Sequence, residues 1–149
     1  MSPAIQRLAF VSWLEEMRPN LMITIGAGPA FSPRRLKLDV EKHLNAIERR
    51  ALGPRWAAKP AAERMIAIGC LEHAESNAHY HLLAQAPDRH EEALFVVGEE
   101  RWRQRHPGGV HHVQSIDSVR RGARYSTKEL WSERSFDAII IHGPRRDLR

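Results

Sequence analysis

The stretch MIAIGCLEHAESNAHYHLLAQA, residues 65–86, predicts two β-strands joined by a short turn. One apolar run extends from Met65 to Leu71, and a second extends from His79 to Ala86. Between them, Glu75-Ser76-Asn77-Ala78 has the polar and small residues that are typical of a turn. Two strands this close together in the chain are expected to pair as an antiparallel hairpin.

A strand and a long helix precede this hairpin. Leu21 to Ile25 is a short, β-branched run before a Gly-Ala-Gly-Pro segment, and it predicts a buried strand. Ser32 followed by Pro33 is typical of a helix start, and Gly53 followed by Pro54 is typical of a helix end. Apolar residues recur between these points at steps of three and four, as one face of a helix requires: Leu36, Val40, Leu44, Ile47 and Ala51.

Further elements are predicted on both sides. Asp88 with Glu91 resembles a capping box and predicts a helix to about Arg105, although the run Leu94–Val97 inside it would also suit a strand. The other predicted elements are a helix over Ile5–Met17, a strand over Val110–Ile116, a helix from Asp117 or Ser118 through Leu130, and a strand over Phe136–Ile141.

The order of elements from residue 21 to residue 116 is therefore βαββαβ. This order predicts an α+β, ferredoxin-like (RRM-like) fold, in which a mostly antiparallel sheet carries its helices on one face. The other face of the sheet would be free for a ligand. We expect a single domain over residues 1–149, with an N-terminal helix within residues 1–19 and a polar tail over residues 142–149. Many functions use this fold, so the site residues must decide the function.

Composition narrows the class of protein. The 149 residues are 42% hydrophobic and 28% charged, which is typical of a globular chain. The 23 Lys and Arg residues exceed the 18 Asp and Glu residues, and the net charge of +5 is compatible with an anionic partner such as nucleic acid. Cys70 is the only cysteine, which excludes an internal disulfide and fits a reducing compartment. With no apolar run of about 20 residues and no visible secretory signal, we expect a cytoplasmic protein without a membrane partner.

The segment His79-Tyr80-His81 is a candidate metal site. On a strand, residues i and i+2 point to the same face, so the two imidazoles would lie close enough to share one divalent cation. A two-residue turn at Ser76-Asn77 would place Glu72 directly opposite His81 on that face. Two imidazoles and a carboxylate suit an ion that must also hold a substrate oxygen. His73 would replace Glu72 if the turn had three residues, and Glu75 and Gln85 are further alternatives for the third ligand.

The histidine motifs could also arise by chance, or could have surface or structural roles instead of binding a metal. The chain has nine histidines, so a His-x-His pair arises easily by chance and two exposed strand histidines are the plain alternative. His111 and His112 are adjacent and would face opposite ways on a strand, which favours surface or structural roles for them.

Tyr125 and Lys128 form a second candidate pair. Their i,i+3 spacing places the phenol and the ammonium on one face of a helix. The alternative is a surface turn in which Ser126 caps a helix and Tyr125 serves only in packing. Arg120, Arg121 and Arg124 lie just before this pair and would either grip phosphate or form a solvated helix face.

These motifs, in this order, resemble those of the HUH endonucleases. An apolar strand with a threonine (Leu21-Met22-Ile23-Thr24) is followed by His79-Tyr80-His81 and then by Tyr125-Ser126-Thr127-Lys128. The chain looks most like the rolling-circle replication initiators, the Rep proteins of plasmids and of single-stranded DNA phages and viruses. The resemblance covers about residues 21–131, and the fold of that family agrees with the element order derived above.

The resemblance implies a metal-dependent endonuclease that nicks and rejoins single-stranded DNA through a covalent 5′-phosphotyrosine. His79, His81 and Glu72 would bind Mg²⁺ or Mn²⁺, Tyr125 would be the nucleophile, and Lys128 would be the lysine one helical turn later. Arg120, Arg121 and Arg124 would contact the DNA. The implied partners are single-stranded DNA, as an origin hairpin or a nick site, and host replication proteins. Two departures from the family are the absence of a second tyrosine near Tyr125 and of a Walker A segment, so we expect neither a two-tyrosine mechanism nor an attached helicase.

Three alternatives compete with this prediction. The first is a related HUH transposase or relaxase, although single-tyrosine transposases tend to carry a glutamine where this chain has Lys128. The second is a non-catalytic nucleic-acid-binding module that stacks bases on its sheet, which the low aromatic content of 7% disfavours. The third is a metal-dependent hydrolase that uses water in place of Tyr125.

Overall fold

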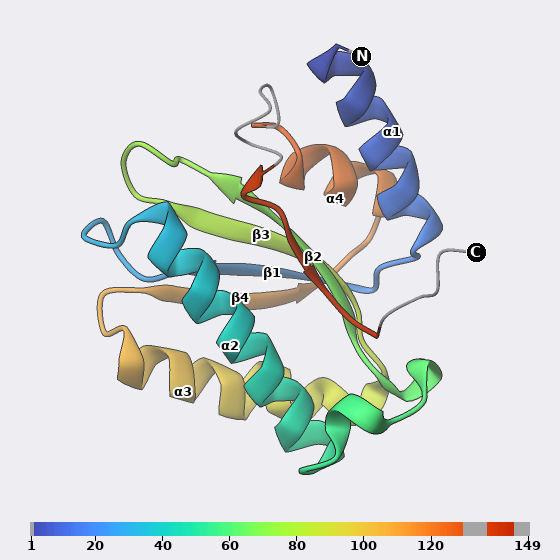
Figure 1. Ribbon diagram of the computed structural model, residues 1–149, viewed down its shortest axis with the longest axis vertical. Helices are drawn as coiled ribbons and strands as arrows, with labels where there is room; N and C mark the ends of the chain where they lie inside the picture. The colour runs from blue at the N-terminus through green and yellow to red at the C-terminus, as the bar shows by residue number, and fades with distance from the viewer. Residues whose placement is uncertain (1, 130–136, 145–149) are drawn as a thin grey trace.

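Five antiparallel strands form an open sheet in the order β4-β1-β3-β2-β5 (Figure 1). The computed structural model describes residues 2–129 and 137–144. The strands are β1 (Leu21–Gly26), β2 (Ile66–Glu72), β3 (His79–Gln85), β4 (Val110–Ser115) and β5 (Ile140–His142). The α-helices of the described residues are α1 (Pro3–Glu16), α2 (Pro33–Leu52), α3 (Gly98–Arg105) and α4 (Val119–Ser126). Short helical turns precede β2, η1 (Trp56–Ala58) and η2 (Ala61–Glu63), and others lead into α3, η3 (Asp88–His90) and η4 (Ala93–Val97).

The expected α+β, ferredoxin-like fold is confirmed. Strands β1 to β4 occupy the order 4-1-3-2 and every pair of neighbours is antiparallel, as a βαββαβ chain requires. β5 extends the sheet at the outer edge of β2. None of the helices in the described segments is both long and apolar enough to cross a lipid bilayer.

The helix α2 shows how local sequence sets these elements. Ser32 is its N-cap and accepts a hydrogen bond from the backbone N–H of Arg35, while Pro33 occupies the first turn, where no N–H is needed. Gly53 ends the helix with a φ of 90°, a conformation that side chains disfavour. Both ends lie where the sequence predicts them.

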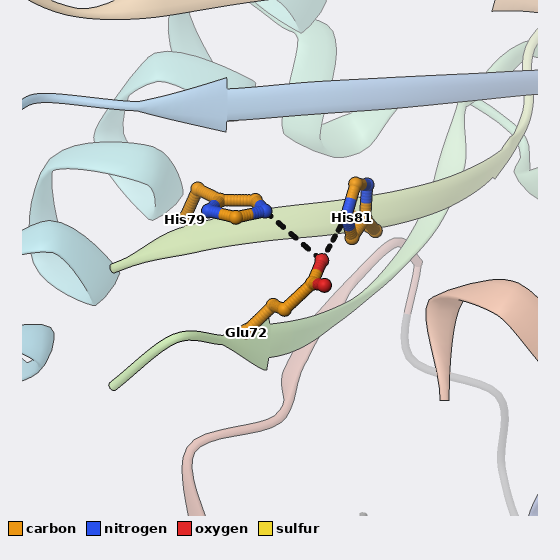
Figure 2. A group of neighbouring side chains, drawn as sticks. All are labelled: Glu72, His79 and His81. Carbon is orange, nitrogen blue, oxygen red and sulfur yellow. Dashed lines mark hydrogen bonds and ion pairs between the residues drawn. The ribbon is translucent and has the colours of Figure 1, made fainter. Parts of the chain in front are cut away.

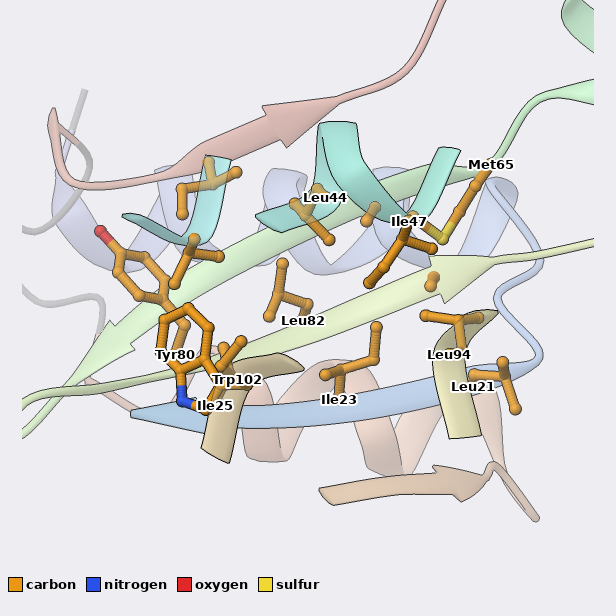
Figure 3. Close-up of a cluster of buried hydrophobic side chains, with 14 of the residues drawn as sticks. Leu21, Ile23, Ile25, Leu44, Ile47, Met65, Tyr80, Leu82, Leu94 and Trp102 are labelled. Atoms are coloured by element: carbon orange, nitrogen blue, oxygen red, sulfur yellow. The ribbon is translucent and has the colours of Figure 1, made fainter. Parts of the chain in front are cut away.

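The main hydrophobic core lies between the sheet and the helices α2 and α3 (Figure 3). Alternate residues of the central strands point into it, including Ile23 and Ile25 of β1 and Leu82 of β3. Tyr80 and Trp102 are also fully buried there, and the indole Nε1–H of Trp102 donates a hydrogen bond to the carbonyl of Gly26, 2.8 Å away. This layer holds the sheet rigidly beneath the opposite face.

The helices α1 and α4 pack on one end of that opposite face (Figure 1). They cover a second, smaller cluster because β1, β2 and β3 place apolar side chains there: Met22, Ile68 and Leu83, which contact Leu14, Met17 and Ala123. The surface free for a ligand is therefore narrower than the sequence suggests. It includes Thr24, His79 and His81, and it continues along β4 past His112 and Gln114.

The register of the β2–β3 hairpin differs from the predicted one. Glu72 pairs with His79, and His81 pairs with Cys70 rather than with Glu72. The connection is a loop over residues 73–78, longer than a two-residue turn, and His73 opens it with a φ of 53°. A shift of two residues leaves each side chain on its original face, so Glu72 still shares a face with both histidines.

The predicted helix from Asp88 to Arg105 is confirmed, but its start differs from the expected capping box. Asp88 forms no capping hydrogen bond; a 3-10 turn begins there after Pro87 and leads into a π-helix over Ala93–Val97. The apolar run Leu94–Val97 is thus helical rather than a strand. Leu94 is buried while Phe95 and Val96 are exposed, which is the one-sided burial of a surface helix.

The C-terminal elements are shorter than predicted. The helix α4 ends at Ser126, and β5 begins only at Ile140; Leu130 and Phe136, the predicted limits of the two elements, lie outside the described residues. His142 belongs to β5 rather than to a polar tail. It is buried, and its Nε2 lies 3.2 Å from the Oε1 atom of Glu48, a fully buried carboxylate on α2.

Candidate metal centre

Glu72, His79 and His81 converge on one point of the open sheet face (Figure 2). Glu72 is the last residue of β2, and the two histidines are the first and third residues of β3. The Nε2 atom of His79 lies 2.9 Å from Oε2 of Glu72, and Nε2 of His81 contacts the same oxygen. The three ligand atoms all lie within 4.8 Å of one another, so this group could hold a metal ion.

Strand alternation explains why the two imidazoles meet. His79 and His81 lie two residues apart on β3 and point to the same side, while Tyr80 points into the core, where its hydroxyl donates to the carbonyl of Ala138 at 2.7 Å. Their ring centroids are 4.9 Å apart. The packing of Tyr80 thus fixes the orientation of both ligands.

The Nδ1 atoms of the two histidines are held by other groups. Nδ1 of His79 lies 3.1 Å from the carbonyl oxygen of Asn77, and Nδ1 of His81 lies 3.1 Å from the hydroxyl of Thr24. The Asn77 carbonyl can only accept, so His79 carries a proton on Nδ1 and, when neutral, leaves the lone pair of Nε2 facing Glu72. Such secondary hydrogen bonds orient imidazole ligands at metal sites. A cation at this point would be coordinated by the lone pairs of His79 Nε2 and Glu72 Oε2, which otherwise face each other.

Charge at the centre favours the metal-binding forms of its ligands. Burial alone would raise the pKa of Glu72, but the Lys128 ammonium and the nearby imidazoles of His81 and His79 bring this pKa below its usual value. Burial lowers the pKa of His81. At neutral pH the buried Glu72 is therefore ionised and His81 is neutral, which are the states that ligate a cation.

Tyr125 and Lys128 both lie beside this centre. The ring of Tyr125, in the last turn of α4, stands edge-on to His81 with centroids 5.0 Å apart, and its side chain is 47% exposed. Lys128 forms an ion pair with Glu72, and its Nζ atom lies 4.2 Å from the centroid of the Tyr125 ring. The hydrogen bond with Glu72 raises the pKa of Lys128, so the ammonium stays protonated. Lys128 follows the end of α4, in a turn where its N–H donates to the carbonyl of Tyr125 at 3.3 Å.

A groove of about 550 Å³ runs past the centre between β4 and α4. Its lining includes Thr24, His79, His81, His112, Gln114 and Tyr125. Arg121 also lines it, so an anionic ligand in the groove would reach both the ligand cluster and a guanidinium.

The three candidate arginines are divided between two surfaces. Arg120 and Arg124 line a different groove against α1, where Nε of Arg120 lies 3.8 Å from Oε1 of Glu15. Arg120 and Arg124 lie four residues apart and share one helix face, whereas Arg121 shares its face with Tyr125, four residues further on. The structure brings only Arg121 of the three to the groove beside the candidate metal ligands.

Of the alternative third ligands, Glu75 and Gln85 lie apart from the imidazole pair, whereas the ring of His73 lies beside that of His79 with centroids 5.2 Å apart. Glu75 is exposed in the loop, and Gln85 is exposed at the far end of β3, opposite Ile66. His73 contacts Glu72 from its other side, with Nε2 3.4 Å from Oε1. Glu72 is the residue that joins His79 and His81.

His111 and His112 face opposite ways, as strand alternation predicts. His111 is buried against His43 of α2, with Nε2 atoms 3.1 Å apart, whereas His112 lines the groove. The contact of the Thr24 hydroxyl with His81 could not be predicted from the sequence, and it forms because the pairing of β1 with β3 places the two residues opposite each other. That contact becomes visible only once the strand order is known.

Comparisons of the chain with protein-family models, with curated proteins and with solved structures found no match.

Proposed function

We propose that this chain is an HUH-type endonuclease of the Rep class, which nicks and rejoins single-stranded DNA through a covalent tyrosine intermediate. The observation that carries the proposal is the half-exposed Tyr125 ring placed against His81 of the Glu72, His79 and His81 cluster. A nucleophile beside a metal site is the arrangement that transfer of a phosphoryl group needs.

The donor set suits a divalent cation, and the resemblance to the HUH endonucleases points to Mg²⁺ or Mn²⁺. When bound, such an ion supplies charge withdrawal from the non-bridging phosphate oxygens and orients the phosphate for in-line attack. Glu72, His79 and His81 would hold it, because they offer one carboxylate and two imidazoles within 4.8 Å of one another. The remaining coordination positions would be open to substrate.

In the proposed reaction the hydroxyl oxygen of Tyr125 attacks the phosphorus of the scissile phosphodiester. The Tyr125 O–P bond forms, the bond from phosphorus to the 3′ oxygen breaks, and the phenol proton passes to solvent while the leaving 3′ oxygen takes up a proton. The product is a 5′-phosphotyrosine and a free 3′-hydroxyl. Attack by a 3′-hydroxyl on that phosphotyrosine reverses the step and rejoins the strand.

Lys128 supports the reaction by charge rather than as a base. Its hydrogen bond with Glu72 raises its pKa, so it has no lone pair with which to accept the proton of Tyr125. An ammonium 4.2 Å from the ring centroid would stabilise negative charge on the phenolate or on the phosphate. A lysine at this position also favours the Rep class over a transposase, by the resemblance of the motif.

The groove beside the centre supports a single strand of DNA as the substrate. Arg121 lines it together with the polar side chains of His112 and Gln114. Arginine binds phosphate through a planar fork of N–H donors, and the net charge of +5 would assist association with a polyanion. Initiation of rolling-circle replication, with host replication proteins as partners, is the biological role that this class of reaction serves.

A covalent-capture experiment tests the proposal. The protein is mixed with Mn²⁺ and a labelled pool of single-stranded oligonucleotides of random sequence, and adducts are resolved on a denaturing gel. We expect the native chain to form an adduct. Tyr125→Phe should abolish it while retaining DNA binding, and His79→Ala should remove the stimulation by metal.

Tyr80→Phe is the matched control, because Tyr80 is the only other tyrosine and is fully buried. This variant should keep the adduct. An adduct that persists in Tyr125→Phe would place the nucleophile elsewhere. Cleavage by the native chain without an adduct would identify a hydrolase that uses water, and binding without cleavage would identify a non-catalytic module.

A further inference from the structure

The two oxygens of the Glu72 carboxylate face different sets of groups. Oε2 contacts the Nε2 atoms of His79 and His81, as described above. Oε1 faces away from them, toward Nε2 of His73 at 3.4 Å and the ammonium of Lys128. A carboxylate whose two oxygens face different groups of ligands can bridge two cations.

A second group of possible ligand atoms, from His73 and Glu129, lies on the Oε1 side of Glu72. Glu129, in the turn after α4, places its Oε1 atom 3.7 Å from Nδ1 of His73, and its Oε2 atom accepts a hydrogen bond of 2.6 Å from the His73 backbone N–H. Glu72, His73 and Glu129 each offer a ligand atom within 4.8 Å of the others. The His73 and Glu129 side chains are 53% and 39% exposed, so an ion from solvent can reach them.

We propose that Glu72, His73 and Glu129 form a second divalent-cation site that shares the Glu72 carboxylate with the first. Two carboxylates and one imidazole suit a first-row ion such as Mn²⁺. The inference rests on the first centre binding a cation but not on the cleavage of DNA.

Lys128 competes with the second cation. Its ammonium already neutralises Oε1 of Glu72, and a divalent ion on that oxygen would be repelled by it. The second ion therefore binds more weakly than the first and displaces Lys128 from Glu72. The displaced ammonium remains next to Tyr125, whose ring centroid is 4.2 Å from Nζ. Occupancy of the second site would thus release the Lys128 ammonium from Glu72 and leave it to interact with Tyr125.

Titration of the DNA-free protein with Mn²⁺, followed by electron paramagnetic resonance, tests this site. We expect two ions per native chain, with the spectrum of an exchange-coupled pair at saturation. Glu129→Gln keeps an acceptor for the His73 N–H but loses the charge, and should bind one ion with no coupled spectrum. Lys128→Met removes the competing ammonium and should tighten the second ion by about tenfold or more.

Glu75→Gln is the matched control, because it removes one carboxylate from the exposed part of the same loop. It should retain two ions. A single ion in the native chain and in Lys128→Met, unchanged by Glu129→Gln but lost in His79→Ala, would overturn the second site and leave the first intact. Mn²⁺ binding that is unaffected by His79→Ala would instead overturn the first centre and, with it, the shared carboxylate.

Discussion

Two buried histidines, His43 on α2 and His111 on the edge strand β4, face each other through Nε2 atoms 3.1 Å apart. One ring must donate and the other accept, so the contact depends on at least one neutral imidazole. Burial is the main cause that lowers the pKa of His43 to about 3 and that of His111 to about 4. The positive charge of a protonated His111, followed by the guanidinium groups of Arg101 and Arg105, lowers the pKa of His43 further.

This pair should make the fold sensitive to acid. In the unfolded chain both histidines take up protons as the pH falls through about 6.5, whereas in the folded chain they resist until about pH 3 to 4. Their contribution to stability is therefore complete above pH 6.5 and is lost progressively below it. At pH 5, which is 1.5 units below 6.5, the loss is about 2 kcal/mol for each histidine.

Urea unfolding at pH 7.5 and at pH 5.0, in the presence of a chelator, measures the effect. His111→Asn should shrink the difference in unfolding free energy between the two pH values by about 2 kcal/mol. His112→Asn, on the same strand but facing the groove, should leave the difference unchanged. An equal pH dependence in both variants would show that the buried pair does not govern acid sensitivity.

The faces of single residues could be predicted from the sequence, whereas their contacts could not. Strand alternation is a local property, so the shared face of His79 and His81 follows from their spacing alone. The partner of Glu72 depends on the length of the loop over residues 73–78, which the turn-like residues at 75–78 did not reveal. The ion pair of Lys128 with Glu72 joins positions 56 residues apart, and no local pattern encodes it.

The π-helix η4 at the start of α3 reverses the usual effect of a glycine substitution. In an ordinary helix, Gly→Ala is stabilising by about 0.5–1 kcal/mol. A Cβ on Gly98, however, would lie 2.5 Å from the carbonyl oxygen of Ala93, the acceptor of the π-helical hydrogen bond. We expect Gly98→Ala to lower the free energy of unfolding by roughly 1–3 kcal/mol.

Gly122 in α4 is the matched control. Its Cβ would meet Ile116 and Leu83 at 3.5 Å, an ordinary contact distance, so Gly122→Ala should raise the free energy of unfolding by about 0.5–1 kcal/mol. Thermal or urea unfolding of the two variants tests the contrast. Stabilisation by both substitutions would argue against the π-helical turn.

Strong end signals set the limits of a helix, and apolar runs alone predict the limits of β1 to β4 to within about one residue. Ser32, Pro33 and Gly53 act through the backbone of their own neighbourhood, and α2 begins and ends where they indicate. Asp88 carries a similar signal, but it is the first residue of a 3-10 turn whose N-cap is Pro87, and no side chain caps the start of that turn. The π-helix after it has no sequence signature comparable to a cap.

At the level of the whole molecule, the order of elements predicted the topology but not the extent of the open face. The βαββαβ order leaves few ways to build an antiparallel sheet, so the strand order 4-1-3-2 follows. The docking of α1 and α4 over Met22 and Leu83 depends on contacts between distant segments. The surface left beside them is the one that holds the candidate metal ligands, the groove and Tyr125.

The candidate metal centre ties together parts of the chain that would separate on unfolding. Its ligands come from β2 and β3, Thr24 of β1 holds His81, and Lys128 joins it from beyond α4. A cation that binds this assembly but not the unfolded chain stabilises the fold by about 2.7 kcal/mol at 100 times its Kd. For a chain of this size, that corresponds to a rise in Tm of about 5–10 °C.

Thermal unfolding over a series of Mn²⁺ concentrations measures this linkage without any DNA. We expect Tm to rise with the logarithm of the Mn²⁺ concentration once it exceeds Kd. His79→Ala should reduce the rise to what the weaker second site supplies, since it deletes one of the imidazoles at Oε2 of Glu72. His112→Ala, which removes a groove histidine outside the ligand cluster, should keep it. A Tm that is independent of Mn²⁺ in the native chain would mean that the three side chains meet without binding a cation, and that their convergence serves only the packing of the hairpin.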